Sequence, residues 1–172
     1  MKNLDFQPKK STRKFRNNYK LHDLAESHGK NLLVQFGFDF KAFGEDRRYE
    51  KVWEKGEDKP DALIDYNGKK LLLDWKGKHK AKWIVNERAI RSYEKWSAEL
   101  NLPLMIAFFV FDSENKLTDR RFAIINLHPY KVQSQREWDK NKTVRFPDNL
   151  PVFNGVNIMK FFKDEYSTLI KK

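Results

Sequence analysis

The chain contains no cysteine among its 172 residues. Disulfides, thiolate nucleophiles and cysteine-ligated zinc sites are therefore excluded within it, and the composition suits a reducing compartment such as the cytoplasm. Histidine is scarce too, and no HxH or HExxH spacing occurs. The histidines are His22, His28, His79 and His128. A metal bound mainly by imidazole is therefore not expected, and any metal should have oxygen ligands.

Long apolar segments are also missing from the chain. No run of about 18 apolar residues is present and no apolar segment follows the basic N-terminus, so we expect neither a transmembrane helix nor a secretory signal. Positive charge is in excess, with 35 Lys and Arg against 24 Asp and Glu and a formal net charge of +11. Such a surface attracts polyanions. We expect DNA as the partner rather than a membrane, in a cytoplasmic protein.

The N-terminal residues carry much of this charge. Residues 1–20 contain seven Lys or Arg and one acid, and we interpret residues 1–18 as a flexible basic arm. It would either follow a phosphate backbone or remain a solvated terminus. Over residues 19–36, apolar side chains recur at spacings of three and four before Gly37, which predicts an amphipathic helix.

The following segments have the periods of strands and helices, and one domain accounts for all of them. Strands are predicted at 47–54, 61–66, 69–76, 104–111 and 121–127, and helices at 84–100 and 157–170. This order predicts an α/β fold with a central mixed β-sheet flanked by helices and followed by a C-terminal helix. Residues 19–130 would form the core, and residues 131–172 an extension whose helix packs on it.

Asn67-Gly68 between two apolar runs is a strong signal for a β-hairpin with a two-residue turn. With these residues at the turn, Asp61 lies directly opposite Asp74. Directly opposed side chains share one face with Cβ atoms roughly 4.5–5.5 Å apart, where two carboxylates repel unless a cation lies between them. Because side chains on a strand alternate, Lys76 lies on the same face as Asp74. Two carboxylates and one ammonium group therefore converge.

The other face of the same hairpin is apolar. Its residues are Ala62, Ile64, Leu71, Leu73 and Trp75. This layer would anchor the hairpin against a helix and hold the charged side chains on a rigid element. The alternative is a surface hairpin with Asp74 paired to Lys76 or Lys59 in the solvent, and the interior character of both strands disfavours it.

Phosphodiester hydrolysis requires a divalent cation that polarises a phosphoryl oxygen and lowers the pKa of the attacking water. Magnesium prefers one or two carboxylates together with waters and substrate phosphate. Asp61 and Asp74, with the Trp75 carbonyl, match this demand for Mg²⁺ or Mn²⁺, and Lys76 supplies a positive group. The adjacent residues 77–80, Gly-Lys-His-Lys, add donors for phosphate, and their glycine would permit close backbone approach.

The segments Pro60-Asp61 and Asp74-Trp75-Lys76 resemble the PD-(D/E)XK nuclease superfamily. This superfamily has the restriction-endonuclease-like fold and includes archaeal-type Holliday junction resolvases and related phage or restriction nucleases. The resemblance covers roughly residues 19–127 and implies a core of αβββαβ order. It also implies that Asp61 and Asp74 bind Mg²⁺ or Mn²⁺ and that Lys76 assists the attacking water.

Many members of this superfamily bring a glutamate from the first helix to the metal. Glu26 lies at the edge of the apolar stripe of the predicted first helix, so the resemblance implies that it is a further catalytic residue. The alternative is a surface acid paired with Lys30 one turn later. Glu50 and Glu54 compete for the same role.

Together these features predict a Mg²⁺-dependent endodeoxyribonuclease. Branched or junction DNA is a candidate substrate, because the chain is compact and basic and lacks a motor motif. The alternative is a non-catalytic nucleic-acid-binding protein on the same fold, whose binding would depend strongly on salt. A restriction-type enzyme with one recognition sequence is a third interpretation. RNA stays open as a substrate, and cutting of both strands with one site per chain would favour a homodimer.

Overall fold

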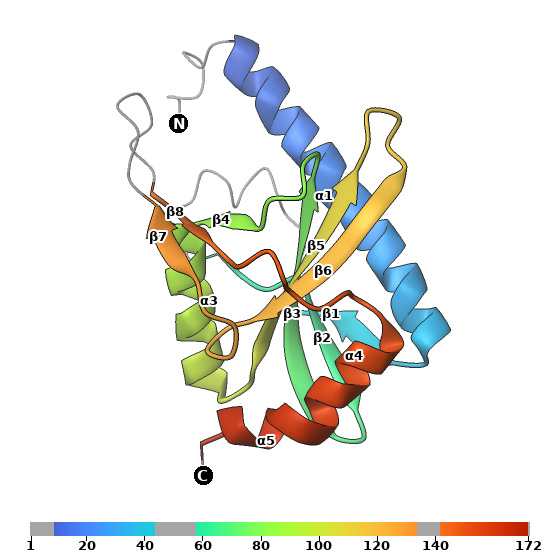
Figure 1. Cartoon of the computed structure of the whole chain (residues 1–172), viewed down its shortest axis with the longest axis vertical. Coiled ribbons are helices and arrows are strands. Elements are labelled where there is room, and N and C mark those ends of the chain that lie inside the picture. Colours follow the sequence, from blue (N-terminus) through green and yellow to red (C-terminus); the bar gives the residue numbers. More distant parts are fainter. Residues whose placement is uncertain (1–8, 44–57, 134–141, 172) are drawn as a thin grey trace.

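A computed structural model of the chain describes residues 9–43, 58–133 and 142–171, with side chains described from Lys20 onward. It has an α/β fold in which a five-stranded mixed sheet lies between helical layers (Figure 1). The predicted fold class, a central mixed sheet flanked by helices with a C-terminal helix, is confirmed. The predicted strand at 47–54, with Glu50 and Glu54, lies outside the described residues.

The main sheet has the strand order β1-β2-β3-β5-β6. Its strands are β1 (Asp39–Ala42), β2 (Ala62–Tyr66), β3 (Lys69–Lys78), β5 (Leu104–Phe111) and β6 (Leu117–Ile124). Strands β3 and β5 run parallel, whereas the other neighbouring strands are antiparallel. Every residue of β5 is buried, because this strand is covered on both faces.

Helices cover both faces of the sheet. The helical segments are α1 (Lys9–Phe36), α3 (Glu87–Leu100), α4 (Gly155–Lys160), the π-helical segment η2 (Phe161–Glu165) and α5 (Tyr166–Leu169). Side chains of α1 and of the three C-terminal segments share one hydrophobic cluster with one face of the sheet. On the other face α3 packs together with a small sheet of order β4-β8-β7. The strands of this small sheet are β4 (Ile84–Asn86), β8 (Thr143–Arg145) and β7 (Lys131–Gln133).

The hairpin of β2 and β3 has the predicted register. Asn67 and Gly68 have φ angles of 52° and 86°, and positive φ at both positions is what a two-residue type I′ turn requires. The paired residues end with Ala62 opposite Leu73. Asp61, one residue earlier, donates its backbone N–H to the carbonyl oxygen of Leu73 at 2.9 Å. The paired residues end at Ala62, and direct opposition of Asp61 and Asp74 stays a prediction.

The apolar layer predicted on the other face of the hairpin is confirmed. All five of its residues are at most 1% exposed, and α1 contributes Leu21, Ala25 and Leu33 to the same cluster. The hairpin is thus anchored against the first helix. Burial of this layer stabilises the strands that carry the charged side chains.

Two glycines bring α1 and β3 into close contact. A Cβ atom at Gly29 would collide with ring carbons of Trp75, and a Cβ atom at Gly77 would collide with the backbone carbonyl of Leu21. Close approach of a phosphate to the backbone of Gly77 stays a prediction. Its missing side chain admits the helix, because α1 crosses β3 at this residue.

Some predicted boundaries at the N-terminal end are wrong. Helix α1 begins at Lys9 rather than at residue 19, because no glycine or proline interrupts residues 9–28. Residues 9–18 of the predicted arm are therefore helical, and its first eight residues lie outside the described part of the chain. Strand β1, which pairs with β2, was not predicted. The division into arm, core and extension stays a prediction.

The predicted helix at 84–100 is also wrong at its start. Residues 84–86 form β4 and pair with β8, and Asn86, with ψ of 137°, keeps the chain extended until α3 begins at Glu87. No strand was predicted within residues 131–149, yet this segment supplies β7 and β8. These short strands form because they pair with a segment distant in sequence, which local patterns do not report.

Strand β6 spans residues 117–124 rather than 121–127. A tight turn precedes it, in which the Asp112 carboxylate accepts the backbone N–H of Glu114 and of Lys116. The strand therefore starts directly after this turn. It ends early because Leu127 donates its N–H back to the carbonyl oxygen of Ile124 at 3.1 Å, which closes a second turn.

The contact between Gly29 and Trp75 predicts the effect of Gly29→Ala on stability. Replacing a helical glycine by alanine usually stabilises a protein by roughly 0.5–1 kcal/mol. Here the added methyl group must displace a buried ring, so we expect a loss of about 1–3 kcal/mol in the free energy of unfolding. Urea denaturation measures it, with Asn31→Ala at an exposed position of the same helix as the control. A Gly29→Ala protein as stable as its parent would contradict this packing.

His128 predicts a dependence of stability on pH. Its Nδ1 accepts the backbone N–H of Ile124 at 2.8 Å, and burial lowers the pKa of this imidazole below its usual 6.5. The unfolded state therefore binds the proton more tightly, so this contribution to stability is present above about pH 6.5 and is lost as the pH falls through the folded pKa.

The variant His128→Asn tests this expectation, because its side-chain oxygen can accept the same N–H but does not titrate. Between pH 7.5 and pH 5, the free energy of unfolding should fall more steeply for the parent than for His128→Asn. Parallel pH profiles from chemical denaturation would show that His128 is not the group responsible.

Candidate active site

Asp61, Asp74 and Lys76 lie together where β2 begins and β3 passes beside it. Lys76 Nζ is 3.1 Å from Asp74 Oδ2. The side chain of Asp74 is only 6% exposed, whereas those of Asp61 and Lys76 are 23% and 30% exposed. Asp74 is therefore the most deeply buried of the three groups, and the side chains of Asp61 and Lys76 lie closer to the solvent.

The Asp61 carboxylate is held from two sides. Its Oδ2 accepts the backbone N–H of Trp75 at 2.9 Å and lies 3.0 Å from Nε2 of His22 on α1. Hydrogen bonds to a charged acceptor are stronger than those between neutral groups. A strand and a helix therefore fix the orientation of this carboxylate together.

The Asp74 carboxylate is held by α3. The hydroxyl of Tyr93 donates a hydrogen bond to Asp74 Oδ2 at 2.7 Å, and Tyr93 is itself 1% exposed. Lys76 Nζ lies 5.5 Å from the centre of the Tyr93 ring, a distance at which an ammonium group is attracted to an aromatic face. Tyr93 therefore contacts both the acid and the lysine.

The two carboxyl groups ionise very differently. Burial raises the pKa of Asp74 to about 7; the charge of Asp61 and a hydrogen bond between the two carboxyl groups also raise it, against the opposing effects of Lys76 and Tyr93. Burial disfavours ionisation of Asp61 as well, but the hydrogen bond and charge of His22 outweigh it, so the pKa of Asp61 is lowered. Such a separation is expected for like charges held side by side.

The basic groups respond to these acids. Burial opposes the charge of Lys76, yet the nearby Asp74 carboxylate outweighs burial and moves the pKa of Lys76 well above its usual value. The pKa of His22 is raised in the same way, since the hydrogen bond and charge of Asp61 exceed the effect of burial. Lys76 is therefore a permanent cation at neutral pH.

The donor set of the site fits a hard divalent cation. Asp61 and Asp74 offer carboxylate oxygens, which Mg²⁺ and Mn²⁺ prefer. The pKa of about 7 for Asp74 indicates that the positive charge supplied by the protein does not fully compensate its burial. A bound cation would provide that charge and favour the ionised form. Asp61 and Asp74 are thus the residues that would hold it.

Trp75 takes part in the site through its backbone. Its N–H holds Asp61, while its side chain is fully buried in the cluster beneath α1. The role of the Trp75 carbonyl as a metal ligand stays a prediction.

The predicted phosphate donors of residues 78–80 have different surroundings. Lys78 Nζ donates to the carbonyl oxygen of Ile84, and burial together with the charge of Lys76 lowers the pKa of Lys78 to about 8. His79 Nδ1 lies 3.2 Å from the carbonyl oxygen of Phe111. The side chain of Lys80 is exposed, so a phosphate could reach it.

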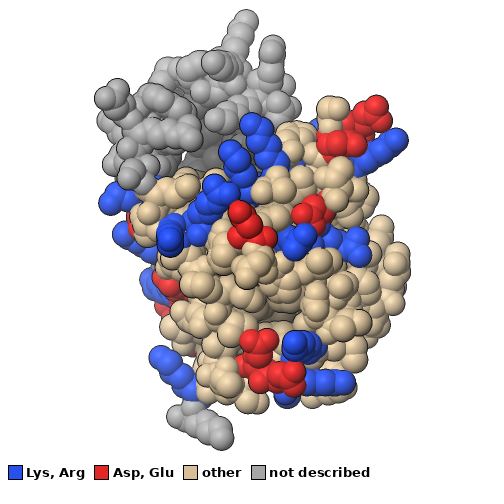
Figure 2. Space-filling model, in the orientation of Figure 1, with Lys and Arg blue, Asp and Glu red and all other residues tan. Residues whose placement is uncertain are grey.

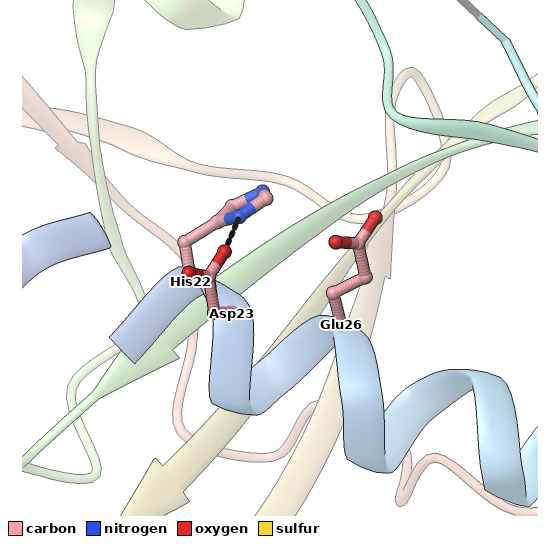
Figure 3. A group of neighbouring side chains, drawn as sticks. All are labelled: His22, Asp23 and Glu26. Carbon is pink, nitrogen blue, oxygen red and sulfur yellow. Dashed lines mark ion pairs between the residues drawn. The ribbon is translucent and has the colours of Figure 1, made fainter. Parts of the chain in front are cut away.

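A second group of potential ligands lies on α1 beside Asp61. His22, Asp23 and Glu26 carry ligand atoms that all lie within 4.8 Å of one another; Figure 3 shows His22 and Glu26, one turn apart, pointing to the same side of the helix. Glu26 Oε2 is also 3.4 Å from Lys30 Nζ, which is the alternative pairing that the sequence allowed. A catalytic role of Glu26 stays a prediction.

His22 and Tyr93 contact the site residues, although neither was predicted as a site residue. His22 lies one turn before Glu26 on the same helix, so a helix face that brings Glu26 to the site brings His22 there as well. Tyr93 lies on the buried face of α3, where a tyrosine hydroxyl requires a hydrogen-bond partner. This requirement could have indicated that Tyr93 contacts a polar residue of the site. Its partner is Asp74.

The surface of the protein carries charges of both signs. Figure 2 shows Lys and Arg side chains in a band across the upper part of one face, with acids interspersed. Within the described residues, no helix combines the length and apolar character needed to cross a membrane.

Comparison with known proteins gives a distant structural likeness. No protein-family model matches the chain, and no curated protein sequence matches it. Among solved structures, the chain is similar to Hjc, a Holliday junction resolvase of Archaeoglobus fulgidus, with 12% identity and a TM-score of 0.41 over 70% of this chain and 83% of that one. At this level of similarity the site has to be interpreted from the residues of this chain.

The contact between Tyr93 and Asp74 predicts a measurable coupling. Tyr93→Phe removes the only hydroxyl of that side chain and leaves the buried carboxyl with one partner fewer, so the free energy of unfolding should fall by about 1–3 kcal/mol. A double-mutant cycle with Asp74→Asn, followed by chemical denaturation, isolates the pair. Additive effects of the two substitutions would mean that the hydrogen bond contributes nothing.

Proposed function

We propose that the protein is a divalent-metal-dependent nuclease of the PD-(D/E)XK type, an endonuclease that hydrolyses phosphodiester bonds in DNA. One observation carries the proposal. The carboxyl groups of Asp61 and Asp74 lie side by side at the β2-β3 hairpin, with the Lys76 ammonium group 3.1 Å from Asp74. Two carboxylates and one cation on rigid strands are the groups that metal-dependent phosphodiester hydrolysis uses.

The order of the elements supports the same assignment. Apart from the short strand β4, which belongs to the small sheet, the elements within the described residues run in the order α1, β1, β2, β3, α3 and β5. This is compatible with the αβββαβ order of a restriction-endonuclease-like core, which we include in the proposal.

Each side chain has a role that follows from its contacts. Asp61 and Asp74 would bind Mg²⁺ or Mn²⁺, which when bound supplies a polarised phosphoryl oxygen and a water of lowered pKa. Tyr93 and the Trp75 N–H orient the two carboxylates. Lys76, charged and partly exposed, neutralises negative charge that develops on the phosphate and helps to position the attacking water.

The substrate class follows from charge and from the chemistry of the site. A net charge of +11 favours a polyanion, and a site for a divalent cation beside a lysine favours a phosphodiester. DNA is the proposed substrate, and branched or junction DNA is the form to test first. A homodimer would place one site on each strand of a duplex.

A second candidate function is binding of nucleic acid without catalysis. The ion pair between Lys76 and Asp74 favours it, since a lysine beside the acid supplies part of the positive charge that a metal would otherwise provide. This alternative predicts binding that weakens steeply with salt and no turnover.

Substitution of the three central residues tests the proposed function. Asp61→Asn, Asp74→Asn and Lys76→Ala should each reduce cleavage by at least about 100-fold, because each removes a group needed in the transition state. Supercoiled, linear, single-stranded and four-way-junction DNA and RNA, each with Mg²⁺ or Mn²⁺, are the substrates. The two acid variants should still bind DNA, as measured by fluorescence anisotropy.

Strand β1 provides a matched control. Asp39 and Lys41 repeat the acid-x-Lys spacing in the same sheet but are exposed, so Asp39→Asn and Lys41→Ala should cleave like the parent. If Asp61→Asn/Asp74→Asn cuts as well as the parent, the proposed site is wrong. If the parent binds DNA but cuts none of the substrates, the non-catalytic function is favoured.

A further inference from the structure

The small sheet β4-β8-β7 is tied to the candidate active site at two points. Lys78, two residues beyond Lys76 on β3, donates from its Nζ to the carbonyl oxygen of Ile84 at the start of β4. At its other end β4 leads directly into α3, the helix whose Tyr93 holds Asp74. A ligand bound to the small sheet would therefore be held in a fixed position relative to the candidate active site.

The two faces of the small sheet differ in character. Val85 of β4 pairs with Val144 of β8, and both are buried in the cluster that α3 shares with the main sheet. Side chains alternate along a strand and opposed pairs share a face, so the neighbouring row lies on the outer face. In that row Arg145 pairs with Ile84 on one side and with Lys131 on the other. Two adjacent cations therefore lie on the outer face.

The surroundings of this face are also basic. No Asp or Glu occurs in residues 75–86, and the loop before β4 adds the exposed Lys80 and Lys82. The acid recorded beside Arg145 is Asp148, whose carboxylate lies 3.3 Å from the guanidinium group and is 78% exposed. In Figure 2 the band of Lys and Arg side chains passes over the region in which Figure 1 draws β4, β7 and β8. The small sheet is thus part of a continuous basic surface.

The side chains of this face suit a duplex backbone better than unstacked bases. Arg and Lys bind phosphate oxygens and release the counterions of the nucleic acid. Proteins that bind single strands rely on aromatic side chains for stacking, whereas the residues of β4, β7 and β8 include no aromatic one. Sheet faces in other proteins bind duplex DNA along its grooves. Charge and side-chain type together therefore favour a duplex.

We propose that the outer face of the small sheet binds the phosphate backbone of duplex DNA beside the cleavage site. Lys131 and Arg145 would contact phosphates, and Lys80 and Lys82 would extend the surface toward β3. This inference rests on the proposed function, because it takes DNA as the substrate of the neighbouring site. The Asp148 carboxylate limits the attraction, since it competes with phosphate for Arg145.

Fluorescence anisotropy with a labelled DNA duplex tests this surface, using the full chain without divalent ions so that the DNA is not cut. Each lost phosphate contact lowers the slope of log K against log salt concentration by about 0.9. The double variant Lys131→Gln/Arg145→Gln should therefore lower the slope by about 2 and weaken binding by about tenfold at about 100 mM salt. Binding of single-stranded DNA and RNA, measured in parallel, should weaken less.

A matched control removes the same charge elsewhere. Lys70 and Lys163 are exposed and belong to β3 and η2, whose ends lie far from β7 and β8 in Figure 1. Lys70→Gln/Lys163→Gln should stay within about threefold of the parent, because salt screens charges beyond about 10 Å. Circular dichroism verifies folding. If the Arg145 substitution disturbs the fold, Lys131→Glu at its exposed position replaces it, and it should weaken duplex binding more than Lys163→Glu does.

Removal of the competing acid gives a result of opposite sign. Asp148→Asn should raise the affinity for duplex DNA by about threefold, because it leaves Arg145 free to bind phosphate. Asp164→Asn, at an exposed position of η2, removes the same charge and should change the affinity less than about 1.5-fold. Equal affinities of the two variants for the duplex would contradict the contact assigned to Arg145.

The same measurements separate this surface from the proposed function. If the parent cuts DNA but both double variants bind the duplex alike, the small sheet is not the binding surface and the nuclease assignment stands. If the slope falls only in Lys131→Gln/Arg145→Gln while the parent cuts no substrate, the surface is supported and the proposed catalysis fails. If this variant loses affinity for single strands but not for the duplex, the assigned partner is wrong.

Discussion

Asp74 is a carboxyl group at 4% exposure inside a sheet, and the free-energy cost of charging it there organises the residues around it. Its Oδ2 is contacted by Lys76 from the same strand and by Tyr93 from α3, while the carboxyl group of Asp61 lies beside it. One buried acid thus ties together β2, β3 and α3. Its pKa of about 7 shows that these partners compensate its burial incompletely, which leaves a demand for positive charge at the point where a phosphodiester and a cation would meet.

The hairpin register holds this acid in place for a reason unrelated to its charge. A slip of one residue would turn Asp74 toward α1 and Trp75 away from it. Trp75 is fully buried and fits against the missing side chain of Gly29, so such a slip would lose an aromatic core residue and leave a carboxylate beneath the helix. Core packing and the positions of the aspartates therefore select the same register.

Local patterns explain which parts could be predicted from the sequence. The turn at Asn67-Gly68, the alternation along β3 and the apolar run of β5 are properties of neighbouring residues, and each was predicted correctly. His22 and Tyr93 could not be placed in the same way, because their contacts depend on where two helices cross the sheet. Gly77 illustrates what cannot be predicted from local patterns. The sequence shows that this residue has no side chain, but only the packing shows that α1 fills the space.

The first helix links the two parts of the site. Its backbone at Leu21 rests on Gly77 of β3, and His22 is the next residue, so a backbone contact rather than a flexible side chain sets where its imidazole begins. The backbone positions of the two aspartates, by contrast, are set by the hairpin. A core change that moved α1 by a fraction of an ångström would therefore alter the distance between His22 and Asp61 while leaving the two aspartates in register. Asp61 and His22 are thus held by separate elements, and the packing of α1 on β3 sets the distance between them.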